Sequence, residues 1–300
     1  MTLNKYELFL KVAEIGNITK AAETLHYTQA GVSHAIAALE KETGFSLFIR
    51  SNSGVELTDN GKRLLPSIQA LVNEQAKVAQ AIHNINHIVA GTLRIGTFTS
   101  VSVNWIPHII KCFSDKYPDV KFELLSGDYN EISEWIHNGK IDCGFLTTPV
   151  SDDLFFQTLY YDQMFVVLPS AHSLASRKQL TFSDIKDEPF ILPMKGSDQD
   201  IRNLLDKNIK NLKVEYILND DYSVISLASH GFGITIMPDM ILKNFKTDAV
   251  FLSLYPKQYR KVGIASMPMN QVSILTKTFL QFISDFANFD AVSTQNQYPL

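Results

Sequence analysis

An interruption of helical periodicity between residues 15 and 28 is the feature that most constrains how this chain begins to fold. Apolar residues recur at three- and four-residue steps before the interruption and again after it, which predicts amphipathic helices. Gly16-Asn17 ends the first helix, and Thr19 is a suitable N-cap for a short second helix. His26-Tyr27 makes a tight turn, after which Thr28 can cap a third helix. This spacing predicts a helix-turn-helix unit.

The predicted third helix has two different faces. Val32, Ile36 and Leu39 fall on one stripe, which we expect to pack on the first two helices. Small or polar side chains on the opposite face would let the helix approach base edges in the DNA major groove closely. From this unit we expect DNA contacts by Thr19, Lys20, Thr28, Gln29, Ala30, Gly31, Ser33, His34 and Ala37.

A strand–turn–strand pattern follows the third helix. Thr43-Gly44 should end the helix, residues 45–49 and 55–57 are expected as strands, and residues 52–54 form the turn. Arg50 lies in this predicted wing, where a guanidinium can grip a phosphate or enter a minor groove. The wing favours a DNA-reading unit over an ordinary three-helix unit with a polar outer face.

This order of motifs resembles the DNA-binding domain of LysR-type bacterial transcriptional regulators. Two positions depart from that family's usual pattern: Ala30 replaces proline, and His34 replaces arginine. A mostly neutral histidine binds phosphate less well than arginine does. The resemblance implies a winged helix-turn-helix DNA-binding domain over residues 1–58. The matching positions are Ala21, Ala22, Gln29, Ser33, Leu39, Glu40, Gly44, Leu47, Phe48, Arg50, Leu57, Thr58 and Gly61.

Charge and composition narrow the class of protein. The net charge is −4, and the first 63 residues carry seven basic and seven acidic side chains, so DNA affinity must come from charge placement. No segment approaches the roughly 18 apolar residues of a membrane span, and no apolar signal core opens the chain. We therefore expect a cytoplasmic protein without a membrane partner. Cys112 and Cys143 lack C-x-x-C spacing and are expected to be core thiols.

A heptad pattern occupies residues 59–90. Thr58 should cap a long helix in which apolar residues alternate four- and three-residue steps, and this predicts a coiled-coil dimer of two such helices. A helix lying on its own domain would usually show a wider apolar stripe. His83 and His87 have metal-like spacing but lack a third ligand, so a solvated face is expected. The predicted dimerisation residues are Ile68, Leu71, Gln75, Val78, Ile82 and Ile85.

From residue 91 onward, short apolar strands alternate with amphipathic helices, which predicts a mostly parallel sheet covered by helices. Segments 117–120, 138–142 and 231–238 resemble the two-lobed, periplasmic-binding-protein-like effector domain of the same family. The implied fold class is a multidomain α+β and α/β protein with an effector-binding domain at 91–300. Lobe I would span about 91–160 and 267–300, and lobe II about 161–266.

Ligands of open α/β sheets bind beyond the carboxyl ends of the strands. Thr99 and Ser100 follow the first strand at a predicted helix N-terminus, where free N–H groups would favour an anion. Hydroxyl residues at such positions also commonly do no more than cap helices and turns. The candidate effector-binding residues are Thr99, Ser100, Val101, Ser126, Thr147, Thr148, Lys195 and Ser197.

These patterns together predict a transcriptional regulator that binds a pseudo-palindromic operator in double-stranded DNA through paired heads. A small-molecule effector, expected to be anionic, would control it from the cleft. The resemblance also implies a homotetramer built from dimers, and RNA polymerase as a partner if the chain is an activator. A cytoplasmic solute-binding module, or an enzyme using the cleft, is the alternative. The cleft loops hold no recognisable catalytic or metal-binding cluster, so we expect no enzyme activity, cofactor or metal.

Overall fold

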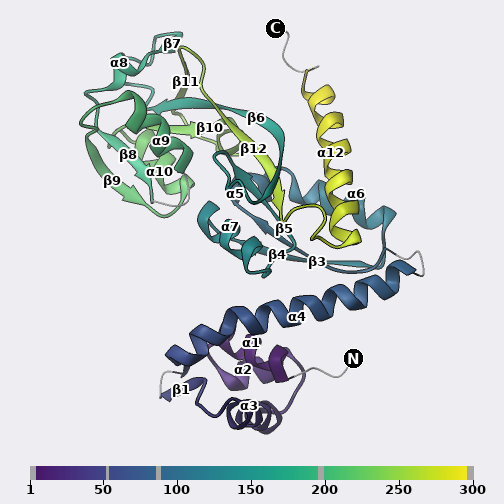
Figure 1. Ribbon diagram of the computed structural model, residues 1–300. Coiled ribbons are helices and arrows are strands. Elements are labelled where there is room, and N and C mark those ends of the chain that lie inside the picture. The colour runs from purple at the N-terminus through teal and green to yellow at the C-terminus, as the bar shows by residue number, and fades with distance from the viewer. Residues whose placement is uncertain (1–4, 52–53, 86–88, 195–198, 296–300) are drawn as a thin grey trace. The chain divides into compact units, whose positions relative to one another are not determined.

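The computed structural model describes residues 5–51, 54–85, 89–194 and 199–295. The chain divides into two compact units, Met1–Ile82 and His83–Leu300. Among the described residues, no helix combines the length and apolar character needed to cross a membrane. Figure 1 labels the elements. Those of the first unit are α1 (Lys5–Ile15), α2 (Ile18–Thr24), α3 (Gln29–Thr43), β1 (Phe48–Ser51), β2 (Gly54–Leu57) and the long helix α4 (Asp59–Ile85).

The first unit has a small core of its own. Val32, Ile36 and Leu39 are buried on the inner face of α3, as the sequence predicts, and pack with Phe9 and Leu47. The antiparallel strands β1 and β2 pair from Phe48 with Leu57 to Ser51 with Gly54. Three helices and a two-stranded wing therefore form one packed unit, and the predicted winged helix-turn-helix is confirmed.

Two of the three caps predicted for α2 and α3 are confirmed. Thr28 caps α3 and Gly44 ends it in the left-handed conformation, both as predicted. The N-cap of α2 is Asn17, whose side chain accepts a hydrogen bond from Lys20 N–H at 3.0 Å. The prediction of Thr19 was wrong because both residue types cap well, and apolar spacing does not fix a helix start to within two residues.

The second unit contains two lobes built on strands that run through both. The strands of lobe I lie in the order β4, β3, β5, β12 and β6, with the first three parallel. They are β3 (Gly91–Thr97), β4 (Val120–Ser126), β5 (Cys143–Thr147), β6 (Phe155–Leu168) and β12 (Tyr259–Ser266). Its helices are α5 (Thr99–Asn104), α6 (Ile106–Lys116), α7 (Tyr129–His137) and α12 (Ile274–Gln295).

Lobe II continues from the far end of β6. Residues 164–168 of β6 pair with β10 (Thr235–Pro238) and β11 (Val250–Leu254), while residues 155–163 pair with β12. The other strands are β7 (Gln179–Leu180), β8 (Phe190–Pro193) and β9 (Val214–Leu218). The helices are α8 (Phe182–Ile185), α9 (Gln199–Asn208), α10 (Asp221–Ser229) and α11 (Asp239–Leu242). Each lobe has a separate hydrophobic core, which confirms the two-lobed α/β prediction.

The two cysteines differ in their environments. Cys143 is buried in β5, and burial raises the pKa of its thiol well above the ordinary value, as expected of a core thiol. Cys112 is exposed on α6, so its assignment to the core was wrong. The buried face of α6 consists of Ile106, Ile109 and Phe113, and Cys112 lies outside it.

Candidate nucleic-acid interface and ligand cleft

The residues predicted to contact DNA all lie on the outer surface of the first unit. Gly31 and Ser33 are half-buried, and the other eight are exposed. The exposed eight are Thr19, Lys20, Thr28, Gln29, Ala30, His34, Ala37 and Arg50. Thr28 Oγ1 also accepts a hydrogen bond from Gly31 N–H at 3.1 Å, so it fixes the N-terminus of α3. The outer face of α3 is thus accessible at its N-terminal end.

The wing is tied to the helices on either side of it. Glu40 Oε1 accepts hydrogen bonds from Leu47 N–H at 2.7 Å and from Phe48 N–H at 3.2 Å. These bonds hold the chain before β1 out of the ladder, which explains why the strand begins at Phe48 and not at residue 45. Thr58 Oγ1 donates to Ser46 O at 2.8 Å and accepts from Gly61 N–H at 3.0 Å.

The start of α4 lies close to the backbone of the wing. A Cβ on Gly61 would lie 2.3 Å from Leu47 O, so the close approach of α4 to the wing requires glycine. Several positions that carry the family resemblance, Glu40, Leu47, Thr58 and Gly61, therefore set the position of the wing. Arg50 is carried on β1, opposite Val55, with its side chain exposed.

The predicted dimerisation residues of α4 fall into three groups. Ile68 is buried in the core of the first unit. Leu71 and Val78 are 48% and 62% exposed in the single chain, and Gln75 is half-buried. The side chains of Ile82 and Ile85 lie outside the described residues. An apolar strip therefore extends along α4 beyond the part of the helix that packs on the head.

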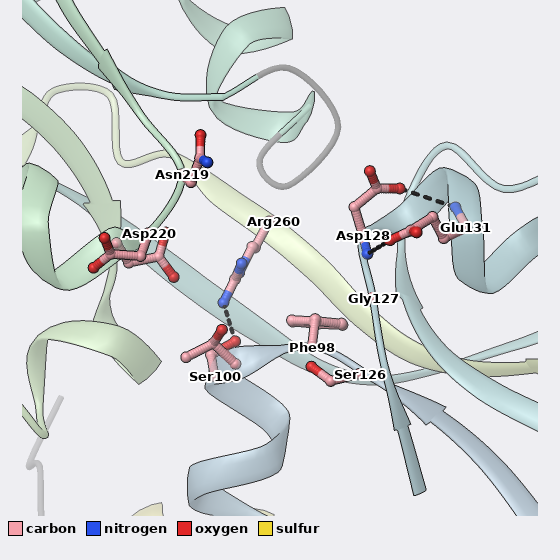
Figure 2. Close-up of a pocket in the computed structure, with 11 residues that line it drawn as sticks. Phe98, Ser100, Ser126, Gly127, Asp128, Glu131, Asn219, Asp220 and Arg260 are labelled. Atoms are coloured by element: carbon pink, nitrogen blue, oxygen red, sulfur yellow. Dashed lines mark hydrogen bonds between the residues drawn. The ribbon is translucent and has the colours of Figure 1, made fainter. Parts of the chain in front are cut away.

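A cavity of about 280 Å³ lies between the two lobes. Thr99, Ser100 and Ser126 line it, as predicted, where strands β3 and β4 end. Asp128 and Glu131 at the start of α7 form part of the wall, and Asn219, Asp220 and Asp221 at the start of α10 form another part (Figure 2). No sequence pattern singled out these acidic residues or Arg260, which also lines the cavity.

A second cavity of about 230 Å³ lies beside Tyr129 and Asp200. Thr147 and Thr148, both predicted, line it together with Asn203 of α9. The structure thus distributes the predicted hydroxyl residues over two cavities. Val101 lines neither, because it is fully buried in the core of lobe I. Lys195 and Ser197 lie outside the described residues.

A buried arginine joins the walls of these cavities. Arg260 Nε donates to Asp162 Oδ2 at 2.9 Å, Nη1 donates to Tyr129 Oη at 3.0 Å, and Nη2 donates to Ser100 Oγ at 2.7 Å. The Asp200 carboxylate lies 3.6 Å from Nη1. Arg260 shares the buried face of β12 with Val262 and Ile264, so strand alternation in the sequence could have predicted its burial.

Burial perturbs both carboxyl groups beside this guanidinium. Burial raises the pKa of Asp162, although the charge of Arg260 and a hydrogen bond from Met240 N–H oppose the rise. Burial likewise raises the pKa of Asp200, against the opposing charge of Arg260. Within the described parts of the chain, no group of three or more His, Cys, Asp or Glu residues could hold a metal ion.

Both units match models of known protein families. Residues 3–62 match the bacterial regulatory helix-turn-helix protein of the lysR family, and residues 87–288 match the LysR substrate binding domain. The chain belongs to the LysR family of bacterial regulators. Members of this family are DNA-binding transcription factors with an effector-binding domain, and they are not enzymes. The predicted function class is therefore confirmed.

Individual LysR-type proteins resemble the chain over nearly its whole length. The uncharacterized HTH-type transcriptional regulator YvbU of Bacillus subtilis is 32% identical over 288 residues, which cover 95% of this chain and 98% of that protein. The structure of a full-length OxyR variant from Pseudomonas aeruginosa has a TM-score of 0.73 at 18% identity, covering 96% and 94% of the two chains. CbnR in complex with its target DNA has a TM-score of 0.67 at 17% identity, covering 94% and 98%.

Proposed function

We propose that this LysR-type regulator binds its operator through the outer face of α3 and the β1–β2 wing. One observation carries the proposal: the inner stripe of α3 is fully buried, and the outer face of the same helix, beside the wing, is accessible. Gln29 and Ser33 would contact base edges or phosphates, and Arg50 would grip a phosphate or enter the minor groove. His34 would occupy the position of the family's usual arginine.

Two heads are proposed to act together, through pairing of the 59–90 segment. The exposed apolar side chains Leu71 and Val78 support this, since apolar strips on a long helix are usually covered by a partner. A two-fold pair of heads would read two half-sites, so the operator would be pseudo-palindromic. The same proposal includes assembly of such dimers into tetramers, contact with RNA polymerase and action in the cytoplasm.

The effector is proposed to bind between the lobes of the 91–300 segment. Thr99, Ser100 and Ser126 line one cavity there, and Thr147 and Thr148 line its neighbour. The QuiR effector-binding domain, solved in complex with shikimate, supports this use of the fold: it has a TM-score of 0.60 at 22% identity, covering 66% of this chain and 98% of that one. For control, the effector must bind the two regulatory states unequally, by about 1–3 kcal/mol in typical systems.

Selection of random duplex DNA by the purified full-length protein at two salt concentrations tests the proposal. We expect a two-fold symmetric sequence to be recovered. Arg50→Ala should weaken binding to every sequence and lower the salt slope by about one, whereas Ser33→Ala should cost about 1–3 kcal/mol if it contacts a base. Arg177→Ala in lobe II is the matched control and should bind like wild type. Wild-type affinity in both head variants would reject the proposed docking face.

A further inference from the structure

We propose that helix α11 couples the ligand cavity to the contact between the two lobes, and that Asn104 holds this helix against lobe I. The inference rests on the proposed function, which assigns the cavity at Ser100 to the effector. It goes further by naming the part of the fold on which the effector acts. The packing of α11 and the hydrogen bonds of its backbone carry the inference.

Helix α11 packs into both lobes at once. Met240 is 3% exposed, and its side chain belongs to the hydrophobic core of lobe I. The next two residues, Ile241 and Leu242, belong to the core of lobe II. Consecutive residues of one short helix are thus buried in two separate cores. A shift of one lobe relative to the other must therefore disturb the packing of α11, and close-packed cores resist such a disturbance.

Two side chains hold the backbone groups of Met240. Its N–H donates to Asp162 Oδ1 at 3.1 Å, and its carbonyl oxygen accepts from Asn104 Nδ2 at 2.8 Å. Asp162 lies on β6, which runs through both lobes, and Asn104 is the last residue of α5 in lobe I. Asn104 Oδ1 also accepts from Asn244 Nδ2 at 2.9 Å, just beyond the end of α11. Helix α11 is therefore fixed at its backbone as well as through the Met240 side chain.

The same hydrogen bonds lead back to the cavity. Asn104 Nδ2 donates to Ser100 O at 2.7 Å as well as to Met240 O. Arg260 Nη2 donates to Ser100 Oγ at 2.7 Å and lies 2.8 Å from Asp162 Oδ2. Ser100 is thus connected to the carbonyl oxygen of Met240 through Asn104. A second route, through the buried ion pair, connects it to the N–H of the same residue. These bonds form a closed ring between a cavity-lining residue and α11.

A ligand in the cavity acts on this ring at its near side. Ser100 and Arg260 both line the cavity, so a ligand there can bond to either group. Hydrogen bonds in a buried chain polarise one another, and a new partner at one end changes the strength of the others. Engagement of either residue therefore changes the hold on Met240, and with it the position of α11 between the lobes.

Hydrogen exchange of the full-length protein, measured at the amides of residues 239–245, tests the inference. Asn104→Ala removes the donor to Met240 O, so we expect these amides to exchange about two- to tenfold faster, as the loss of a buried hydrogen bond implies. Ser100→Ala removes the acceptor for Arg260 and keeps the carbonyl oxygen that Asn104 binds. It should speed exchange at Met240 N–H by about twofold or more.

Asn208→Ala is the matched control. Asn208 also ends a helix, α9, and its Nδ2 also donates to the carbonyl oxygen four residues earlier, that of Leu204, at 2.7 Å. Both of these residues lie in lobe II, so the variant should leave exchange at residues 239–245 unchanged. Asn244→Ala, at an exposed residue, removes the bond to Asn104 Oδ1 and should raise exchange in the same direction. It keeps the test decisive if Asn104→Ala does not fold.

Binding to the DNA sequence recovered by the selection above connects this result to regulation. Asn104→Ala should change the affinity for that DNA by about fivefold or more, as typical allosteric coupling does, and Asn208→Ala should bind like wild type. Unchanged exchange at residues 239–245 in both Asn104→Ala and Asn244→Ala would overturn the role of Asn104. Wild-type exchange in Ser100→Ala would overturn the link to the cavity.

The two readouts separate this inference from the proposed function. Faster exchange in Asn104→Ala with wild-type affinity for the DNA rejects the coupling and leaves operator binding intact. Recovery of no DNA sequence by the wild-type protein rejects the proposed function, whereas the exchange measurements still decide whether Asn104 and Ser100 hold α11.

Discussion

Arg260 and Asp162 are directly opposite each other on the neighbouring strands β12 and β6, and their side chains form a buried ion pair at 2.8 Å. These are the two strands that run between the lobes, so the pair lies where the lobes meet. A buried ion pair contributes little net stability relative to apolar residues of the same volume, but removal of one partner leaves an uncompensated charge. We therefore expect replacement of both residues to destabilise the protein less than replacement of Arg260 alone.

Arg260→Met should therefore destabilise the second unit by about 3–5 kcal/mol, because Asp162 would be left buried without its partner. Urea denaturation followed by fluorescence measures the loss. The double variant Arg260→Met with Asp162→Leu should regain much of the stability, since it removes both charges. A single variant as stable as wild type would contradict the ion-pair argument.

Asp200 provides a pH-dependent test in the same cluster. Its pKa is raised by burial above the ordinary value of 3.8, so the folded protein holds this proton more tightly than the unfolded chain does. The contribution of Asp200 to wild-type stability should thus fall as pH rises from 3.8 through the raised pKa. Asp200→Asn keeps an acceptor for Ile201 N–H and does not titrate.

The stability of Asp200→Asn relative to wild type should therefore increase as the pH rises through that interval, and should be constant below it. Thermal unfolding of both proteins in a series of buffers measures the difference. A difference independent of pH would mean that Asp200 has its ordinary pKa in the folded state.

The cap of α2 gives a test in the DNA-binding head. Asn17→Ala should destabilise this unit by about 1 kcal/mol, because the side-chain acceptor for Lys20 N–H is lost. Thr19→Ala is the matched control and should change the stability much less, since Thr19 is exposed in the first turn. Chemical denaturation of the two variants would show the opposite ranking if Thr19 were the cap.

The head could be predicted closely because its determinants are local. The inner stripe of α3 and the caps Thr28 and Gly44 follow from spacing and residue type within a few positions. The start of β1 could not be predicted, because it depends on hydrogen bonds from Leu47 and Phe48 to Glu40, seven and eight residues away. A tertiary contact of this kind leaves no periodic signal.

The cleft was less predictable for the same reason. Hydroxyl residues after strand ends, such as Ser100 and Thr147, could be chosen from a general rule about α/β sheets. The partners Arg260, Asp162 and Tyr129 lie in three distant segments that only the fold brings together. Alternation along β12 predicts that Arg260 is buried. It does not predict which groups Arg260 binds.

The strip on α4 leads to a prediction about assembly. Val78→Lys should shift the full-length protein toward monomers in analytical ultracentrifugation, because it would place a charge in the proposed apolar seam where Val78 is exposed in the single chain. Asn73→Lys is the matched control: it adds the same charge about 140° away around the helix and should leave the assembly unchanged. Equal sedimentation of both variants and wild type would reject the seam. Loss of assembly in both would point to a general effect of charge on the helix.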